Sequence, residues 1–319
     1  MRVLVTGANG FIGRELINLL YSHAYKVRGS IRAVSQLSHP HKGCEYVSVG
    51  SLSNTTDWRK ALDGVDVVIH LAARAHMIHE SGENLLHLFR KVNVDATLHL
   101  AQESMKYGVK RFIYLSSIGV NGSFNIKPFT ELDIPSPTQD YAVSKFEAEQ
   151  VLRKLAPSEM EVVIIRPPLV YGPSAPGNFS RLMYWMYKNA PLPFGSIHNK
   201  RSFVALDNLV DLILICINHP AAANEVFLVA DGEDLSTSEF LQRIAIALNK
   251  RSRLLPINQK LLEFCLKLTG KKDLYHRLCD SLQVDISKAR NLLNWTPPVG
   301  VDEELRKTVE QFLSLNRKK

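Results

Sequence analysis

Short apolar runs alternate with longer segments of helical spacing along the first half of the chain. The runs are rich in β-branched residues and lie at residues 2–6, 25–31, 45–50, 66–72, 110–117 and 161–167. Apolar residues at helical spacing lie between them, at residues 14–23, 85–108 and 141–156. The segment at 85–108 closes on Gly108, and glycine commonly ends helices. Strands that alternate with helices predict a parallel sheet with right-handed crossovers.

The pattern changes after Pro167. Residues 166–179 contain four prolines and predict a ligand-holding loop. Further on, residues 210–217 predict a helix, 225–230 a strand, and 236–249 a helix whose capping box is Ser236 and Glu239. The C-terminal third is mostly of helical pattern. We therefore expect an α/β fold, a Rossmann-type doubly wound parallel sheet with a smaller, mostly helical C-terminal substrate lobe.

These patterns also predict how the chain is divided. We expect a nucleotide-binding domain at residues 1–166, completed by a returning segment at about 205–230. The substrate lobe is expected at residues 167–204 and 231–319.

Composition is that of an ordinary globular protein. The chain has 319 residues, of which 45% are hydrophobic and 22% charged. The longest apolar run found starts at Leu212 and is too short to span a bilayer. Glycines and an asparagine interrupt the N-terminal apolar stretch, so no export signal is expected. The four cysteines show no paired short spacing and predict reduced thiols in a cytoplasmic protein.

The formal net charge of +8 permits several kinds of partner. The cations are read as scattered solvated charge, with a phosphate-bearing ligand as the next interpretation. Without a basic block interleaved with aromatics, we expect no nucleic-acid partner. The histidines at 39–41 and 76–80 lack the helical pair of a hydrolytic zinc site, so we expect no metal.

A glycine triplet joins the first predicted strand to the first predicted helix. Gly7, Gly10 and Gly13 allow a tight turn and a close approach of the backbone to a pyrophosphate. The N–H groups at the start of the helix would then face the phosphates. Strand, triplet and helix in this order predict a dinucleotide site.

The acid that usually grips the adenosine ribose is missing. No Asp or Glu occurs between Glu15 and Glu45, and the second predicted strand carries Arg28 and Arg32 instead. Arginines there suit a 2′-phosphate, which favours NADPH over NADH. The alternative is that both arginines are surface residues and that either cofactor binds.

Two tyrosine–lysine pairs have the i, i+4 spacing that lets an ammonium lower the pKa of a phenol. Tyr141 and Lys145 follow a complete nucleotide-binding half and come soon after Ser117, at the end of the fifth predicted strand. Tyr184 and Lys188 lie past the sixth strand, where we expect the aromatic residues to pack within the lobe. The first pair is therefore the catalytic candidate.

Six motifs in order resemble the extended short-chain dehydrogenase/reductase family, in its nucleotide-sugar branch. They read TGANGFIG, LAAR, YLSSIGV, YAVSK, RPPLVYGP and KRSFVALDNLV, and they cover most of the chain. The chain most resembles the UDP-glucose 4-epimerase group, which also holds 4-keto-reductases of bacterial surface polysaccharide synthesis. The resemblance implies a UDP-sugar substrate, NADP or NAD, and a homodimer.

The resemblance also assigns residues. Ser117, Tyr141 and Lys145 match the catalytic triad. The implied cofactor contacts are Gly7, Asn9, Gly10, Phe11, Ile12, Gly13, Arg32, Ser51, Leu52, Leu71, Ala72, Ala73, Asn93, Ser116, Tyr141, Lys145 and Pro168. Asn93 matches a structural asparagine behind the site. The implied substrate contacts are Ser117, Asn178 and Arg201, of which Arg201 would hold the diphosphate.

Two departures from the family pattern bear on function. The missing ribose acid weakens the case for permanently held NAD, and Asn121 stands where a tyrosine is usual, which is expected to alter the wall of the sugar pocket. These points favour a 4-keto-sugar reductase using exchangeable NADPH. The alternatives are a UDP-hexose 4-epimerase with tightly held NAD and a non-catalytic nucleotide-binding scaffold.

Overall fold

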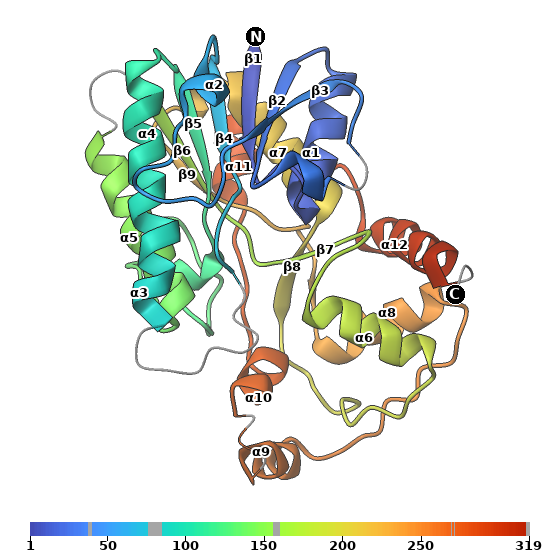
Figure 1. The fold of residues 1–319 in the computed structure, drawn as a ribbon. Helices are drawn as coiled ribbons and strands as arrows, with labels where there is room; N and C mark the ends of the chain where they lie inside the picture. Colours follow the sequence, from blue (N-terminus) through green and yellow to red (C-terminus); the bar gives the residue numbers. More distant parts are fainter. Residues whose placement is uncertain (38–39, 76–84, 156–159, 269, 271, 317–319) are drawn as a thin grey trace.

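The computed structural model describes residues 1–37, 40–75, 85–155, 160–268, 270 and 272–316. Within these residues two β-sheets organise the molecule (Figure 1). The larger sheet has seven strands in the order β3-β2-β1-β4-β5-β6-β9, and every neighbouring pair is parallel. The chain starts at the centre and turns back there, so the switch point lies between β1 and β4. The strands are β1 (Arg2–Thr6), β2 (Lys26–Ile31), β3 (Cys44–Ser48), β4 (Val67–His70), β5 (Arg111–Leu115), β6 (Glu161–Arg166) and β9 (Val226–Leu228).

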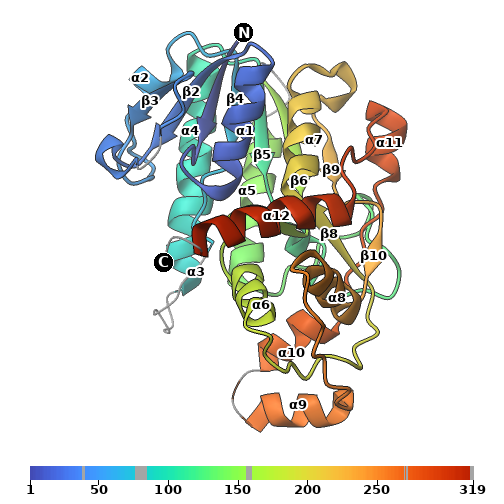
Figure 2. The same cartoon turned by 90° about the vertical axis from the view of Figure 1, so that its right-hand side faces the viewer.

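Helices cover both faces of this sheet, as Figures 1 and 2 show from two sides. On one face Val3 and Val5 pack against α1 (Phe11–Ser22) and α7 (Leu206–Asn218). On the other face Leu4 packs in a cluster with residues of α2 (Arg59–Leu62), α4 (Ala96–Lys106) and α5 (Asp140–Leu155). Because successive side chains of a strand point to opposite faces, the near-continuous apolar strands predicted this three-layer arrangement. The α/β fold is confirmed.

The segment expected as one long helix at 85–108 has a local irregularity. It consists of α3 (Leu85–Arg90), a π-helical turn at Lys91–Asp95 labelled η2, and α4. The π-turn places one extra residue in the helix, and such turns occur often at functional sites. Gly108 follows α4 with a φ of +73°, as its role as a helix stop predicts.

The second sheet and the remaining helices form a lobe beyond the carboxyl ends of the large sheet. Its strands run in the order β10-β8-β7, and its apolar core is separate from those of the large sheet. The elements are β7 (Leu169–Tyr171), β8 (Arg201–Ala205), β10 (Asp234–Leu235), α6 (Asn178–Tyr187), α8 (Thr237–Ala247), α9 (Gln259–Leu268), α10 (Lys272–Cys279) and α12 (Val301–Asn316). Helix α11 (Ser287–Leu293) contacts β9 instead. Short 3₁₀ turns occur at Val34–Gln36, Ile118–Val120 and Pro220–Ala222.

Two expectations for this region need adjustment, and a third is confirmed. The proline-rich segment expected as a loop contains β7, which pairs in parallel with β8. The aromatic side chains of the second tyrosine–lysine pair are not all packed, since Tyr184 and Trp185 are exposed and Met183 and Met186 provide the buried face of α6. The capping box of Ser236 and Glu239 is present at α8, as predicted.

The chain passes between the two sheets at three places, and one carboxylate lies where they meet. Asp231 Oδ1 accepts hydrogen bonds from the Ala205 N–H and from Asn208 Nδ2, both at 2.7 Å. Asp231 Oδ2 accepts one from the Tyr171 hydroxyl at 2.8 Å. Tyr171 ends β7, Ala205 ends β8 and Asp231 follows β9, so this side chain joins two strands of the small sheet to the chain that leaves the large sheet.

All four cysteines are free thiols. Among the described residues, no helix has both the length and the apolar character needed to cross a bilayer.

Candidate active site

The carboxyl end of β1 leads into a turn that only glycine fits. Gly7 has a φ of +66°, and a Cβ there would lie 3.1 Å from backbone atoms of Ala72, in the segment after β4. A Cβ at Gly13 would lie 2.3 Å from the Gly7 carbonyl oxygen. The two glycines therefore bring the start of α1 against the turn, which leaves room for a ligand's phosphates along the backbone.

The first turn of α1 offers backbone donors at this edge of the sheet. Gly10 is the N-cap residue, and no side chain among the described residues caps the helix, which begins at Phe11 and Ile12. Arg14 Nε donates to the Asn9 carbonyl at 3.0 Å, which holds the preceding loop. Uncapped N–H groups carry partial positive charge, so the turn fits a pyrophosphate.

A buried histidine ties the two central strands together beside this turn. Thr6 Oγ1 and His70 Nδ1 are 2.7 Å apart, and His70 Nε2 lies 2.9 Å from Thr97 Oγ1. Burial and the positive charge of Lys145 lower the pKa of His70 to about 3, so the ring is neutral. Thr6 Oγ1 also accepts from the Ala72 N–H at 3.1 Å, which fixes the segment 71–73 over the switch point.

The two arginines of the second strand have different roles, and the expectation for Arg28 is wrong. Its side chain is buried, and its guanidinium is bonded to the Glu45 carboxylate and to the carbonyls of Ala61 and Asp63, at 2.8–3.2 Å. A guanidinium with these partners is a structural ion pair and does not face a nucleotide phosphate. Arg32 is exposed one residue beyond β2, at the edge where the ribose acid is usual.

Two further implied cofactor contacts follow β3 at the same edge. Ser51 is exposed and Leu52 is partly buried, where it packs against the apolar cluster that contains Leu4. Both lie past the carboxyl end of β3, and the register of β2 with β3 pairs Ile31 with Ser48, so this loop and Arg32 belong to one corner of the sheet.

The candidate triad lies at the carboxyl end of β5 and on the face of α5 that follows. Ser117 is partly buried, and its Oγ accepts from the Gly119 N–H at 3.1 Å. A Cβ built at Gly119 would lie 3.2 Å from the Cβ of Ala142, so the turn after β5 packs directly against the first turn of α5. Lys145 Nζ donates to the Leu115 carbonyl at 2.7 Å and lies 6.0 Å from the ring centre of Tyr141.

The pKa values of this pair differ from the simple expectation. Burial raises the pKa of Tyr141 to about 12, and burial lowers the pKa of Lys145 to about 7. The charge of Glu149 acts against the second shift and raises the pKa of Lys145. The predicted lowering of the Tyr141 pKa by Lys145 is therefore not found in the protein alone, because desolvation of the phenol outweighs an ammonium 6.0 Å from its ring centre.

The π-turn holds Asn93 behind the triad. Asn93 Oδ1 accepts from the Arg74 N–H at 2.8 Å, and Asn93 Nδ2 donates to the Arg74 carbonyl and to Ser144 Oγ. Ser144 Oγ in turn donates to the Tyr141 carbonyl at 2.8 Å. Asn93 thus connects the segment after β4 to the helix that carries Tyr141.

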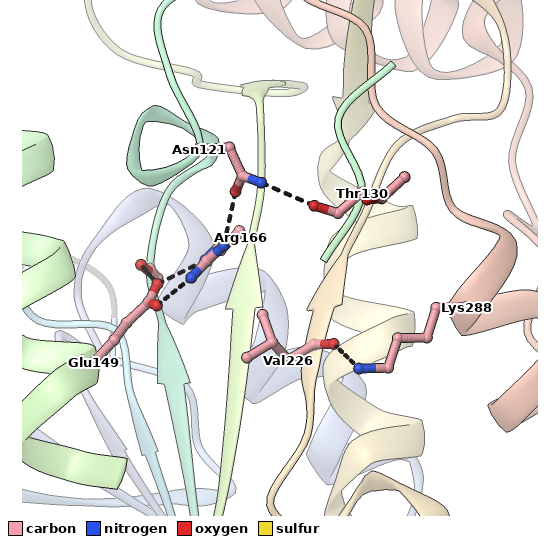
Figure 3. Close-up of polar contacts among 7 residues, drawn as sticks. Asn121, Thr130, Glu149, Arg166, Val226 and Lys288 are labelled. Carbon is pink, nitrogen blue, oxygen red and sulfur yellow. Dashed lines mark hydrogen bonds and ion pairs between the residues drawn. The ribbon is translucent and has the colours of Figure 1, made fainter. Parts of the chain in front are cut away.

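A buried network beneath the triad was not predicted. Figure 3 shows the Glu149 carboxylate paired with the Arg166 guanidinium, whose Nη1 donates to Asn121 Oδ1 at 2.8 Å. Ser116 Oγ donates to Glu149 Oε1 at 2.5 Å, so the side chain of Ser116 points into the protein. Asn121 Nδ2 donates to the Thr130 carbonyl at 3.0 Å.

This network corrects the reading of Asn121 as part of a sugar-pocket wall. Its side chain is buried, and both ends of its amide have partners within the protein. The signal was present in the sequence, because Glu149 lies one helical turn from Lys145 and Arg166 follows the apolar run at 162–165.

The implied substrate residues lie in the lobe and at its junction with the sheet. Arg201 starts β8 and is partly buried, and its Nη1 donates to the Asp280 carbonyl at 2.8 Å. Asn178 is the first residue of α6, and the structure describes its place in the helix but not its side chain. Pro168 is buried between β6 and β7.

Only some of the histidines considered as metal ligands lie in the part of the chain that the structure describes. His39 and residues 76–80 lie outside the described part of the chain. His41 is described, and its Nδ1 accepts from the Gly43 N–H. The residues that the structure describes contain no group of three or more His, Cys, Asp or Glu side chains placed to hold a metal ion.

The arrangement supports proton transfer beside a nucleotide site. A phenol, an ammonium and a hydroxyl lie past the carboxyl ends of neighbouring strands, and the glycine turn lies across the switch point from them. A phenol next to an ammonium can exchange a proton with a substrate oxygen. A nucleotide held by the glycine turn would lie at the same edge of the sheet.

Comparison with known proteins gives consistent matches. The sequence model of the NAD dependent epimerase/dehydratase family matches residues 3–230. A protein of Vibrio cholerae named UDP-glucose 4-epimerase is 44% identical over 322 residues, which cover 99% of this chain and 97% of that protein.

Solved structures match over the full length. The structure of UDP-glucose 4-epimerase from Thermotoga maritima with UDP-glucose superimposes with a TM-score of 0.78 at 25% identity, covering 99% of this chain and all of that one. UDP-glucuronic acid 4-epimerase from Bacillus cereus in complex with NAD gives a TM-score of 0.79 at 23% identity, with 99% of each chain covered, and this likeness concerns the fold.

Proposed function

The chain belongs to the NAD dependent epimerase/dehydratase family, and we propose that it is a UDP-hexose 4-epimerase that works with NAD. The observation that carries this proposal is the placement of Tyr141, Lys145 and Ser117 at the sheet edge that also holds the glycine turn. The 44% identity to the Vibrio cholerae protein supports the 4-epimerase activity and the UDP-hexose substrate class.

The cofactor in this proposal is NAD. The glycine turn and the uncapped start of α1 fit a dinucleotide pyrophosphate. Arg28 is already engaged by Glu45, so of the two arginines that favoured NADPH only Arg32 is left to meet a 2′-phosphate. A single exposed arginine is a weaker signal for NADP than a basic strand.

The chain's own residues then have distinct roles. When bound, NAD supplies the acceptor and the donor of hydride at C4 of the hexose. In its phenolate form Tyr141 Oη would take the proton of the C4 hydroxyl and return it at the end of the cycle. Because both the hydride and the proton are returned to the sugar, epimerisation consumes no reductant. Ser117 Oγ orients the C4 oxygen, Lys145 supplies positive charge beside the phenol, and Arg201 binds the diphosphate.

A 4-keto-sugar reductase that uses NADPH is the second candidate. It is favoured by one observation, the exposed Arg32 just past β2 in a stretch that has no acid between Glu15 and Glu45. Both activities would use the same triad, and they differ in whether the cofactor stays bound or exchanges.

One experiment separates the candidates. Freshly purified protein is denatured to release and quantify bound NAD, and intact protein is incubated with UDP-glucose or UDP-N-acetylglucosamine without added cofactor. We expect NAD to be released from the denatured protein. We also expect the intact protein to form the C4 epimer of the UDP-sugar, which NMR detects. Consumption of NADPH with a UDP-4-keto-6-deoxy-N-acetylhexosamine, and no epimer from UDP-sugars alone, would instead identify a reductase. The absence of both activities would favour a nucleotide-binding scaffold.

A further inference from the structure

Helix α9 carries large apolar side chains on its outer face. Leu261, Phe264 and Leu268 are 54%, 59% and 72% exposed. Positions i, i+3 and i+7 lie on one side of a helix, so these side chains form one stripe. We call Leu261, Phe264 and Leu268 the α9 stripe.

The helix is anchored to the lobe by its other side. Leu262 is buried in the lobe core, and Leu266 packs against that core. Because α9 is held in this way, the α9 stripe is a fixed outward-facing surface and does not turn inward to bury itself. Contiguous exposed apolar surface of this kind marks an interaction site.

The same part of the chain holds most of the protein's net charge. Residues 250–277 contain eight lysines and arginines and two acids, a net charge of +6 in a chain whose total is +8. This concentration corrects the reading of the cations as scattered. Lys260 and Lys267 are exposed on α9 itself, where Lys267 also pairs with Glu263, and Arg277 is exposed on α10, which contacts α9. Arg251 and Arg253 are exposed in the segment that precedes α9.

We propose that the α9 stripe and the cations around it dock the protein on an anionic membrane surface. An amphipathic helix with an apolar stripe and flanking lysines inserts its apolar side chains at the level of the lipid headgroups. Each cation near the surface adds attraction to anionic lipids. Binding would be peripheral, because α9 has only 10 residues.

Charge complementarity favours an anionic membrane over a second copy of the chain and over nucleic acid as the partner of the α9 stripe. A second copy placed on the same face would bring a further +6 against the first, and like charges across an interface disfavour pairing. Nucleic acid would meet the cations but would leave the aliphatic Leu261 and Leu268 without a base to stack on. A bilayer surface satisfies both the cations and the apolar stripe.

The orientation of the molecule agrees with this role. Figures 1 and 2 show α9 and α10 at the end of the molecule away from the N-terminus of β1, which is the direction in which the strands of the large sheet run. Helix α10 ends at Cys279, and the carbonyl of the next residue, Asp280, accepts the hydrogen bond from Arg201. The docked face would therefore lie on the same side of the molecule as the candidate site.

Vesicle flotation tests the proposal without any activity measurement. Protein is mixed with phosphatidylcholine vesicles that either contain or lack phosphatidylglycerol, at low and at high salt. We expect binding to the anionic vesicles that weakens with salt, and little binding to the neutral ones. Replacing the α9 stripe (Leu261→Gln, Phe264→Gln and Leu268→Gln together) should weaken binding at least about tenfold, because apolar area no longer enters the headgroup region.

Matched variants keep the test interpretable. Ile246→Gln on α8 and Leu315→Gln on α12 replace side chains that are 74% and 57% exposed but lie outside residues 250–277, and they should bind as the unaltered protein does. Lys260→Gln with Arg277→Gln removes one exposed cation from α9 and one from α10, and it should weaken binding to anionic vesicles without changing binding to neutral ones. Melting temperatures of all variants report whether each is folded.

Four results would overturn the proposal. The first is absence of binding of the unaltered protein to anionic vesicles. The second is equal binding by the folded triple variant. The third is light scattering that shows oligomers of the unaltered protein which the triple variant loses, with no vesicle binding, because this would assign the face to a second copy. Binding of single-stranded RNA in place of vesicles would likewise assign the face to nucleic acid.

Discussion

Arg166 donates two hydrogen bonds to the carboxylate of Glu149, from Nε to Oε1 at 2.9 Å and from Nη2 to Oε2 at 2.5 Å. Both side chains are almost fully buried. Glu149 is also one helical turn from Lys145 and raises the pKa that burial lowers. The pair therefore supports the proposed site in two ways, through the packing beneath it and through the charge of its lysine.

Removing the Glu149 charge is expected to destabilise the protein strongly. Glu149→Gln leaves the buried Arg166 guanidinium without its counter-ion, which typically costs about 3–5 kcal/mol of the free energy of unfolding. Chemical denaturation measures this loss. Glu147→Gln is the matched control on the same helix, since its ion pair with Arg90 is partly exposed and should cost less than about 1 kcal/mol. Equal effects of the two variants would contradict the structural role of the buried pair.

The two tyrosine–lysine pairs provide a test of the triad. Tyr141→Phe removes the proton-carrying oxygen and should reduce kcat for C4 epimerisation by about 10²–10⁴-fold with substrate binding largely kept. Tyr184→Phe makes the same change in an exposed tyrosine of the second pair and should leave kcat unaltered. Steady-state kinetics with UDP-glucose compare them, and a fully active Tyr141→Phe protein would refute the assignment.

The glycine turn predicts a steric effect on cofactor binding. Gly13→Ala would place a Cβ 2.3 Å from the Gly7 carbonyl oxygen, so α1 must shift away from the turn. We expect a loss of about 1–3 kcal/mol in stability and less NAD in the purified protein. Gly300→Ala is the control, because a Cβ there meets no atom within 4 Å, and it should retain stability and NAD content. Calorimetry and quantification of released NAD give both values.

Glu304 predicts a dependence of stability on pH. Its side chain is fully buried, both carboxylate oxygens lack a hydrogen-bond partner within the described residues, and burial raises its pKa from 4.5 to about 8. Between these values the folded protein binds a proton that the unfolded chain has released, so the free energy of unfolding falls as pH rises through this window.

Glu304→Gln should remove this loss. We expect its melting temperature to exceed that of the unaltered protein by roughly 5 °C above pH 8, and the difference to disappear below pH 4.5. Glu303→Gln, an exposed neighbour, serves as the control and should follow the unaltered protein at every pH. A difference that does not vary with pH would show that Glu304 is already neutral or is paired.

The alternation of strands and helices could be predicted from the sequence, because each strand and helix follows from the local pattern of apolar and polar residues. Apolar runs with β-branched residues predicted β1 to β6, and the glycines at 7, 10 and 13 predicted the turn that follows β1. The short strands β7 and β8 could not be found in this way. They have three and five residues, and they exist because they pair with each other across a long stretch of chain.

Predictions of side-chain roles were wrong where the residue's hydrogen-bond partner is distant in the sequence. Arg28 looked like a phosphate ligand because its position at the second strand was visible, whereas its bonds to Glu45 and to the carbonyls of Ala61 and Asp63 were not. Asn121 looked like a pocket residue for the same reason, since Arg166 lies 45 residues away. Buried polar groups need partners, and only the fold identifies them.

Asp231 has a consequence for how the lobe can move. A lobe joined by one connection can rotate about it. Here Asp231 lies on the connection from β9 to β10, and its carboxylate bonds Ala205 at the end of β8 and Tyr171 at the end of β7. A wide rotation of the small sheet against the β9–β10 connection would break the hydrogen bonds of Asp231 to Tyr171 and Ala205. We therefore expect the lobe to tilt about Asp231 by small amounts and the sheet to keep a fixed distance from β8, so that room for a sugar depends on local loop rearrangement instead of wide opening.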